Sequence, residues 1–131
     1  MLEKQRSEKV RVLILDVFFM SINVITLEGE FVNIDGNGNR VAALCYGPKQ
    51  VVIVAGMNKV VSDVGSAVKR IKTHACPANT IRLGRDTPCA ETGKCSNCLQ
   101  LGVTACSMTV VTRFCNLGRI HVILVNDNLG Y

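Results

Sequence analysis

A continuous apolar run, Val51 to Ala55, constrains the fold of this chain more than any other feature. Such a run, without polar alternation, is typical of a central strand that is covered on both faces of its sheet. We expect this strand at Gln50–Ala55, closed by Gly56. The following segment, 58–75, has apolar residues at helical spacing, namely Val60, Val61, Val64, Ala67, Val68 and Ile71. A strand, a glycine and an amphipathic helix form a βα unit, which favours a parallel crossover and the α/β class.

The elements on either side extend this unit into one α/β domain over residues 1–131. The expected elements are a helix at 3–15, strands at 17–26 and 31–35 joined by a tight turn at Gly29, a short helix at 40–45 ended by Gly47-Pro48, and closing strands at 108–114 and 119–125. The polar, cysteine-rich stretch 85–106 is typical of a long irregular loop within the domain.

Composition limits the classes of function. The chain is 48% hydrophobic but only 5% aromatic, so its core is built from aliphatic residues. Its net charge of +5 comes from Lys and Arg residues spread along the chain, and no basic run carries stacking aromatics, which argues against a nucleic-acid surface. The apolar stretch 12–20 is interrupted by Asp16 and is shorter than the ~20 residues of a membrane span. Glu3 and Glu8 argue against a signal peptide, so we expect a cytoplasmic protein with no membrane partner.

A glycine-rich turn from Asp35 to Arg40 is the strongest candidate for a binding site. Gly36 and Gly38 tolerate positive φ and leave room for an approaching group. Asn39 is a suitable N-cap, and the free N–H groups of the helix that follows would point back at the turn. With the side chains of Asp35 and Asn37 and the guanidinium of Arg40, this turn predicts a cradle for a small anion. The alternative is a β-to-α turn with a purely structural role.

The same turn argues against a nucleotide cofactor. A Walker loop needs Gly-Lys followed by Ser or Thr, and a dinucleotide fingerprint needs Gly-x-Gly-x-x-Gly. Neither pattern is present in the stretch from Asp35 to Arg40.

Four of the seven cysteines form a candidate metal site. Cys89, Cys95, Cys98 and Cys106 have the spacing C-x5-C-x2-C-x7-C, which suits an S4 site for zinc and is close to the spacing of some iron–sulfur ligands. The alternatives are reduced thiols without a metal, or a redox pair at Cys95 and Cys98. We expect the remaining three, Cys45, Cys76 and Cys115, to be small structural residues, with Cys45 and Cys115 buried.

Several motifs together resemble the LUD (lactate utilisation) domain family over roughly residues 16–131. They are Ser21-Ile-Asn-Val-Ile-Thr26, Val32-Asn-Ile-Asp-Gly-Asn-Gly-Asn-Arg-Val-Ala-Ala43, Tyr46-Gly-Pro-Lys49, Ile53-Val-Ala-Gly56, Asn58-Lys59, Thr87-Pro-Cys-Ala90, Gly93-Lys-Cys95 and Gly118-Arg-Ile-His-Val-Ile-Leu-Val125. The resemblance implies a three-layer α/β sandwich with a mixed, largely parallel sheet, like that of ribose-5-phosphate isomerase and the CoA-transferases. It also implies a part in an iron–sulfur system of lactate oxidation.

Family members usually carry helices ahead of the strand that begins here near Val17. Without them an apolar sheet face would be exposed, so we expect a homo-oligomer with its contact near 13–19. Two functions remain. One is a component of lactate oxidation that binds a small anionic molecule at the Asp35 to Arg40 turn. The other is a non-enzymatic zinc or iron–sulfur module that acts with partner subunits of lactate oxidation.

Overall fold

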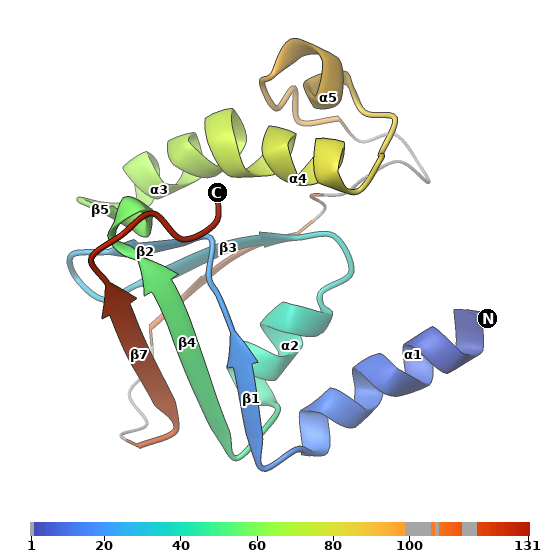
Figure 1. The fold of residues 1–131 in the computed structure, drawn as a ribbon, viewed down its shortest axis with the longest axis vertical. Helices are drawn as coiled ribbons and strands as arrows, with labels where there is room; N and C mark the ends of the chain where they lie inside the picture. Colours follow the sequence, from blue (N-terminus) through green and yellow to red (C-terminus); the bar gives the residue numbers. More distant parts are fainter. Residues whose placement is uncertain (1, 99–105, 107, 114–117) are drawn as a thin grey trace.

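The structure is a computed structural model of the chain, and it describes residues 2–98, 106, 108–113 and 118–131. Figure 1 shows helices packed on strands that form two sheets. The helices are α1 Leu2–Arg11, α2 Asn39–Tyr46, α3 Val64–Arg70, α4 Cys76–Arg82 and α5 Pro88–Thr92. The strands are β1 Val17–Met20, β2 Val24–Thr26, β3 Phe31–Asp35, β4 Gln50–Gly56, β5 Val60–Val61, β6 Met108–Thr112 and β7 Ile120–Val125.

The first sheet is parallel and has the order β1-β4-β7, with the predicted strand β4 at its centre. Val51, Ile53 and Ala55 of β4 are fully buried on its inner face. On the other face Val52 and Val54 are only half-buried, so the expectation that this strand is covered on both sides is wrong. The described residues place a helix, α2, against the inner face alone, which explains the difference.

The second sheet is mixed and has the order β5-β2-β3-β6. β2 and β3 form the predicted antiparallel hairpin, and Gly29 in its turn has φ +79°, which suits glycine. The single strand expected at 17–26 is in fact two strands, β1 and β2, in different sheets. The chain bends between them at Asn23, whose backbone N–H donates to Asn33 Oδ1 (3.3 Å) and whose side-chain Oδ1 accepts from the backbone of Ile34 (3.0 Å).

The helix expected at 58–75 begins later and ends later than predicted. A 3₁₀ turn at Met57–Lys59 leads into β5, where Val60 and Val61 pair with β2 instead of continuing a helical stripe. Asp63 then caps α3 by accepting a hydrogen bond from Ser66 N (2.8 Å). The helical path continues through a π-turn at Ile71–Ala75 into α4 and passes Pro77. Proline is tolerated there because it occupies the first turn of α4.

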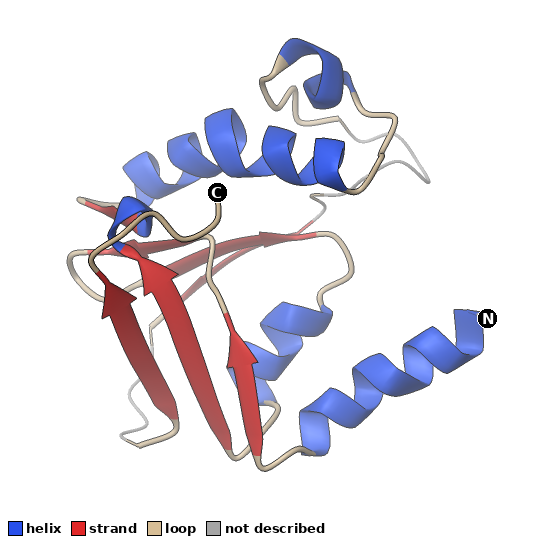
Figure 2. Cartoon of the chain, viewed as in Figure 1, coloured by secondary structure: helices blue, strands red, loops and turns tan. Residues whose placement is uncertain are grey.

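These elements stack in three layers, which confirms the predicted three-layer α/β class (Figures 1 and 2). The continuous helical path of α3, the π-turn and α4 covers one face of the mixed sheet, and the core between them contains Val24, Val32 and Ile71. The parallel sheet and α2 form the third layer, with Phe31, Leu44 and Ile53 in the core against the other face. Strand pairing is mostly parallel, as expected.

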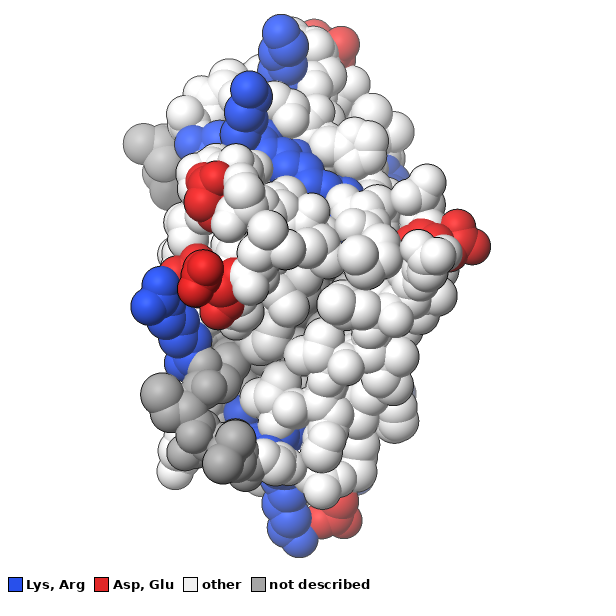
Figure 3. Space-filling model, turned by 90° about the vertical axis from the view of Figure 1, so that its left-hand side faces the viewer, with Lys and Arg blue, Asp and Glu red and all other residues white. Residues whose placement is uncertain are grey.

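The outer face of the parallel sheet carries uncharged side chains. Phe19, Val52 and His121 are in register across β1, β4 and β7, and Val54 pairs with Ile123 on the same face. Phe19 is 69% exposed and Ile123 is 50% exposed. Figure 3 shows the side of the molecule where β7 lies, and the charged side chains lie mostly toward the margins of that view. The side chains of α1 from Glu3 to Arg11 are also exposed. None of the helices in the described residues is long and apolar enough to cross a membrane.

Candidate functional site

A polar cavity of about 610 Å³ lies where the chain leaves the carboxyl ends of β1, β4 and β7. In parallel α/β sheets this edge is the usual place for a ligand. Its lining residues come from the segment after β1, from the end of β3, the turn after it and the start of α2, from the turn after β4, from α4 and from the C-terminal segment. They are Ser21, Asn23, Ile34, Asp35, Gly36, Asn39, Arg40, Lys59, Asn79, Arg82, Gly130 and Tyr131.

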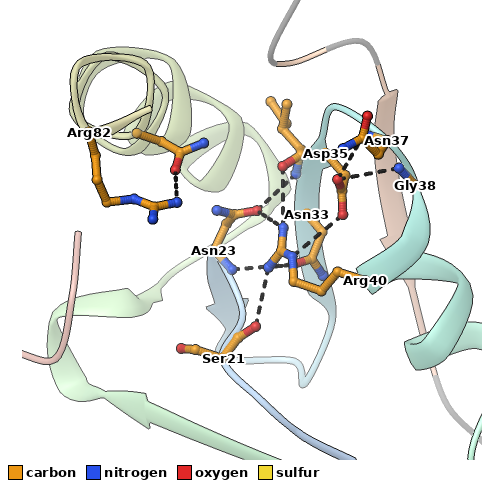
Figure 4. Close-up of polar contacts among 10 residues, drawn as sticks. Ser21, Asn23, Asn33, Asp35, Asn37, Gly38, Arg40 and Arg82 are labelled. Carbon is orange, nitrogen blue, oxygen red and sulfur yellow. Dashed lines mark hydrogen bonds and ion pairs between the residues drawn. The ribbon is translucent and has the colours of Figure 1, made fainter. Parts of the chain in front are cut away.

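The Asp35 to Arg40 turn borders this cavity, but its local geometry differs from the expectation. The residue that precedes α2 is Gly38, with φ +76°, and Asn39 is the first residue of the helix and provides no side-chain cap. Asp35 Oδ1 instead accepts hydrogen bonds from the backbone N–H groups of Asn37 and Gly38 (3.3 Å each; Figure 4). Asp35 therefore holds the turn closed, and the N–H groups of Asn37 and Gly38 are used within the turn.

Arg40 joins the segments around the cavity (Figure 4). Its guanidinium donates to Asn23 Oδ1 (2.9 Å) and Asn33 Oδ1 (3.1 Å). It also donates to the carbonyl oxygens of Ser21 (3.2 Å) and Ile34 (3.3 Å). Its Nε lies 3.5 Å from Asp35 Oδ2. The main role of Arg40 is thus to hold these segments together, and its positive charge is partly balanced by the Asp35 carboxylate.

Two buried polar atoms beside Arg40 have no hydrogen-bond partner in the described part of the chain. They are Asn33 Nδ2, a donor, and Asp35 Oδ2, an acceptor whose ion pair with Arg40 is long. Buried polar atoms are nearly always satisfied in native proteins, so each exception calls for an explanation. Of the two residues, Asp35 lines the cavity, and its Oδ2, which accepts no hydrogen bond, is available to a polar partner there.

Lys59 is the cation that the sequence analysis missed. It follows β4 directly, is 5% exposed, and its Nζ donates to Ser21 Oγ (3.0 Å). Among the described residues no carboxylate forms an ion pair with it. Burial, and then the charges of Arg70 and Arg40, lower the pKa of Lys59 from its ordinary value. Its position after the carboxyl end of a central parallel strand was the signal that could have identified it.

The opposite wall of the cavity is formed by α4 and the C-terminal segment. Arg82 Nη2 donates to Asn79 Oδ1 (2.8 Å), Arg82 Nε donates to Tyr131 Oη, and Tyr131 Oη donates to Asn79 Oδ1 (3.2 Å). Asn58 fixes the C-terminal segment, because its Nδ2 donates to Gly130 O (3.1 Å) and its Oδ1 accepts from Leu129 N (3.3 Å). The described lining thus has three cationic side chains, Arg40, Lys59 and Arg82, and one carboxylate.

A second cavity, of about 390 Å³, lies between α1 and the other side of the same turn, where Asn37 and Gly38 line it. Its cations, Arg6 and Lys9, are exposed on α1. Because solvent screens exposed charges, this cavity is a weaker candidate for binding an anion than the one around Lys59.

The four cysteines of the predicted metal site lie on α5, on the segment after it and just before β6, and Cys95 and Cys106 pack against the same core as Cys76. Within the described residues no three His, Cys, Asp or Glu side chains are grouped so that they could hold a metal ion. Cys89 lies beside the hydroxyl groups of Thr87 (3.3 Å) and Thr80 (3.5 Å), whereas Cys106 lies against Cys76. Cys95 and Cys98 are partly exposed. The stretch predicted as irregular contains α5, and its residues 99–105 lie outside the described part of the chain.

The remaining cysteines follow the sequence analysis only in part. Cys45 is exposed on α2, so the expectation that it is buried is wrong. The position of Cys115 lies outside the described residues. Cys76 is buried in the core between α4 and the mixed sheet, in keeping with a structural residue.

The comparisons with known proteins give one family. No curated protein and no solved structure matches the chain. The family model described as the LUD domain matches residues 2–125, which is most of the 131-residue chain and includes the turn, Lys59 and Arg82. The chain therefore belongs to the LUD domain family, which is associated with lactate utilisation.

Proposed function

We propose that this LUD-domain protein binds a small carboxylate or similarly small anionic molecule in the cavity around Lys59, as a component of lactate utilisation. The observation that carries the proposal is the buried ammonium of Lys59, which donates to Ser21 Oγ and forms no ion pair with a carboxylate among the described residues. Removing a charged group from water is costly unless an opposite charge compensates for it. An anion in the cavity would supply that compensation.

The neighbours of Lys59 support an anion of small size. Arg40 and Arg82 add positive charge from two other sides of the cavity. Ser21 and Tyr131, which carry hydroxyl groups, also line the cavity. A 2-hydroxy acid combines one carboxylate with one hydroxyl group, and the unused acceptor Asp35 Oδ2 is a suitable partner for that hydroxyl. Lactate is the ligand that the family association suggests.

Calorimetric titration of the protein with L-lactate, and separately with inorganic phosphate, tests the proposal. Hydrogen bonds to charged groups contribute about 1.5–3 kcal/mol, so we expect Lys59→Met to weaken lactate binding about tenfold to hundredfold. Lys49→Met is the matched control, because Lys49 is exposed and its ion pair, among the residues that the structure describes, is with the exposed Asp16. Equal lactate affinities for the wild type and Lys59→Met would refute the proposed site. Binding of phosphate without lactate would keep the site and refute the carboxylate class.

The metal-binding alternative has less support. Within the described residues no three His, Cys, Asp or Glu side chains are grouped so that they could hold a metal ion, so no ligand geometry supports it. The anion-binding proposal, by contrast, is supported by the buried charge of Lys59 and by the cationic side chains that line the same cavity.

A further inference from the structure

The thiols of Cys76 and Cys106 lie in contact, and neither residue is part of the cavity lining described above. Cys76 is the first residue of α4, and Cys106 comes shortly before β6. The residues are 30 positions apart in the chain, and their Sγ atoms are 3.0 Å apart. Both thiols are free. A disulfide needs about 2.05 Å between the sulfurs, so an approach of about 1 Å would bond them. We propose that Cys76 and Cys106 form a reversible disulfide when the protein meets a peroxide.

The two thiols have different surroundings, which assigns a role to each. Cys76 is 3% exposed and belongs to the core that includes Val32 and Ile71. Cys106 packs against this core but is partly exposed, so it is the thiol that an oxidant in solution reaches. Cys106 is accordingly the attacking sulfur and Cys76 the resolving one.

The reaction balances with hydrogen peroxide as the oxidant. The Cys106 thiolate attacks one peroxide oxygen, the O–O bond breaks, and Cys106 becomes a sulfenic acid as hydroxide leaves. The Cys76 thiol then loses its proton and attacks the Cys106 sulfur, and the sulfenic oxygen leaves as water. In sum, two thiols and one hydrogen peroxide give one disulfide and two waters. Thiol reductants reverse the change by exchange.

The bond would connect two walls of the cavity. α4 carries Asn79 and Arg82, whereas β6 begins at Met108, which pairs with Asp35 of β3. The disulfide would therefore tie the helix to the sheet next to the Asp35 to Arg40 turn. It would also close a loop of about 30 residues in the unfolded chain, and such a closure stabilises the folded state.

Peroxide treatment of the reduced, full-length chain tests the inference. The protein is treated with one equivalent of hydrogen peroxide, unfolded in an alkylating agent, digested and examined by mass spectrometry. We expect a Cys76–Cys106 cross-linked peptide as the main product, lost on reduction. We also expect the oxidised protein to melt about 5 °C or more above the reduced protein. Cys45→Ser is the control, because Cys45 is exposed and its removal should change neither result.

Cys106→Ser adds an independent check, with its fold verified by circular dichroism. In this variant we expect Cys76 to remain fully alkylated after the same treatment, because its partner is gone. The inference is overturned if Cys95 and Cys98 form the main product in the wild type. It is also overturned if all cross-links are between chains and disappear in Cys45→Ser. A third result would also overturn the inference: the purified protein contains one zinc ion per chain, and the peroxide releases it. The thiols would then be metal ligands.

Discussion

At the scale of single residues, the buried charge of Lys59 lowers the stability of the fold, and a role in binding explains why a lysine occupies this position. Its ammonium is buried and forms no ion pair with a carboxylate in the described part of the chain, and burial lowers the pKa of Lys59 in the folded state. Between the folded and the ordinary pKa the unfolded chain binds more protons, so the free energy of unfolding rises with pH through that window. Below the pKa of the folded state, Lys59 is charged in both states, and the burial of its charge lowers the free energy of unfolding by the full amount.

Lys59→Met should therefore stabilise the protein at neutral pH while it weakens anion binding. We expect the free energy of unfolding to rise by about 1 kcal/mol, the usual gain from a single stabilising substitution. Urea denaturation of Lys59→Met and of the control Lys49→Met measures the effect. A less stable Lys59→Met would mean that Lys59 supports the fold and would remove this argument for a binding role.

Substitutions of Arg40 and of Arg82 should both weaken anion binding but should differ in their effect on the free energy of unfolding. Arg40→Ala leaves two asparagine side chains and Asp35 without their cation, so we expect a loss of about 2–4 kcal/mol in stability. Arg40→Lys should recover little of it, because an ammonium cannot reproduce the planar fork. Arg82→Ala removes an exposed side chain and should cost less than about 0.5 kcal/mol. Both alanine variants should weaken anion binding. Equal stability losses in urea denaturation would contradict this division.

At the scale of elements, the sequence predicted the types of element better than their limits. The aliphatic run of β4 and the Gly29 hairpin were placed correctly because short-range pattern determines them. Val60 and Val61 were misassigned, since two valines fit a helical stripe and a strand equally well and only pairing with β2 decides between them. The prediction that Asn39 is the cap was wrong. Gly38 precedes α2, and the side chain of Asp35 accepts the hydrogen bonds from the N–H groups of Asn37 and Gly38. Lys59 and Arg82 come together only through tertiary packing.

The turn before α2 depends on the absence of a side chain at Gly38. Gly38 and Gly29 both have positive φ, but a Cβ at Gly38 would lie 2.9 Å from the Met108 methyl group, whereas Gly29 has open space. Alanine at either position costs about 1 kcal/mol of backbone strain. We expect Gly38→Ala to be the more destabilising in thermal unfolding, and Met108→Ala to relieve the difference. Equal costs for the two variants would show that Met108 does not restrict this turn.

At the scale of the whole molecule, the outer face of the parallel sheet favours self-association. Parallel sheets are nearly always covered on both faces, yet Val17, Phe19 and Ile123 are exposed on this one. The face is uncharged and would be self-complementary across a two-fold axis. We expect a homodimer in light scattering at micromolar concentration, and a monomer for Phe19→Glu. A wild-type monomer would contradict this prediction.

The central claim is that the cavity around Lys59 holds a small anion, and chemical-shift mapping tests it most directly. ¹H–¹⁵N spectra recorded during a titration with L-lactate would report which backbone amides respond. The account predicts saturable shifts at Ser21, Lys59, Arg82 and Tyr131, which come from four separate segments that line the cavity. Shifts confined to α1 and the second cavity, or no saturable shifts, would contradict it.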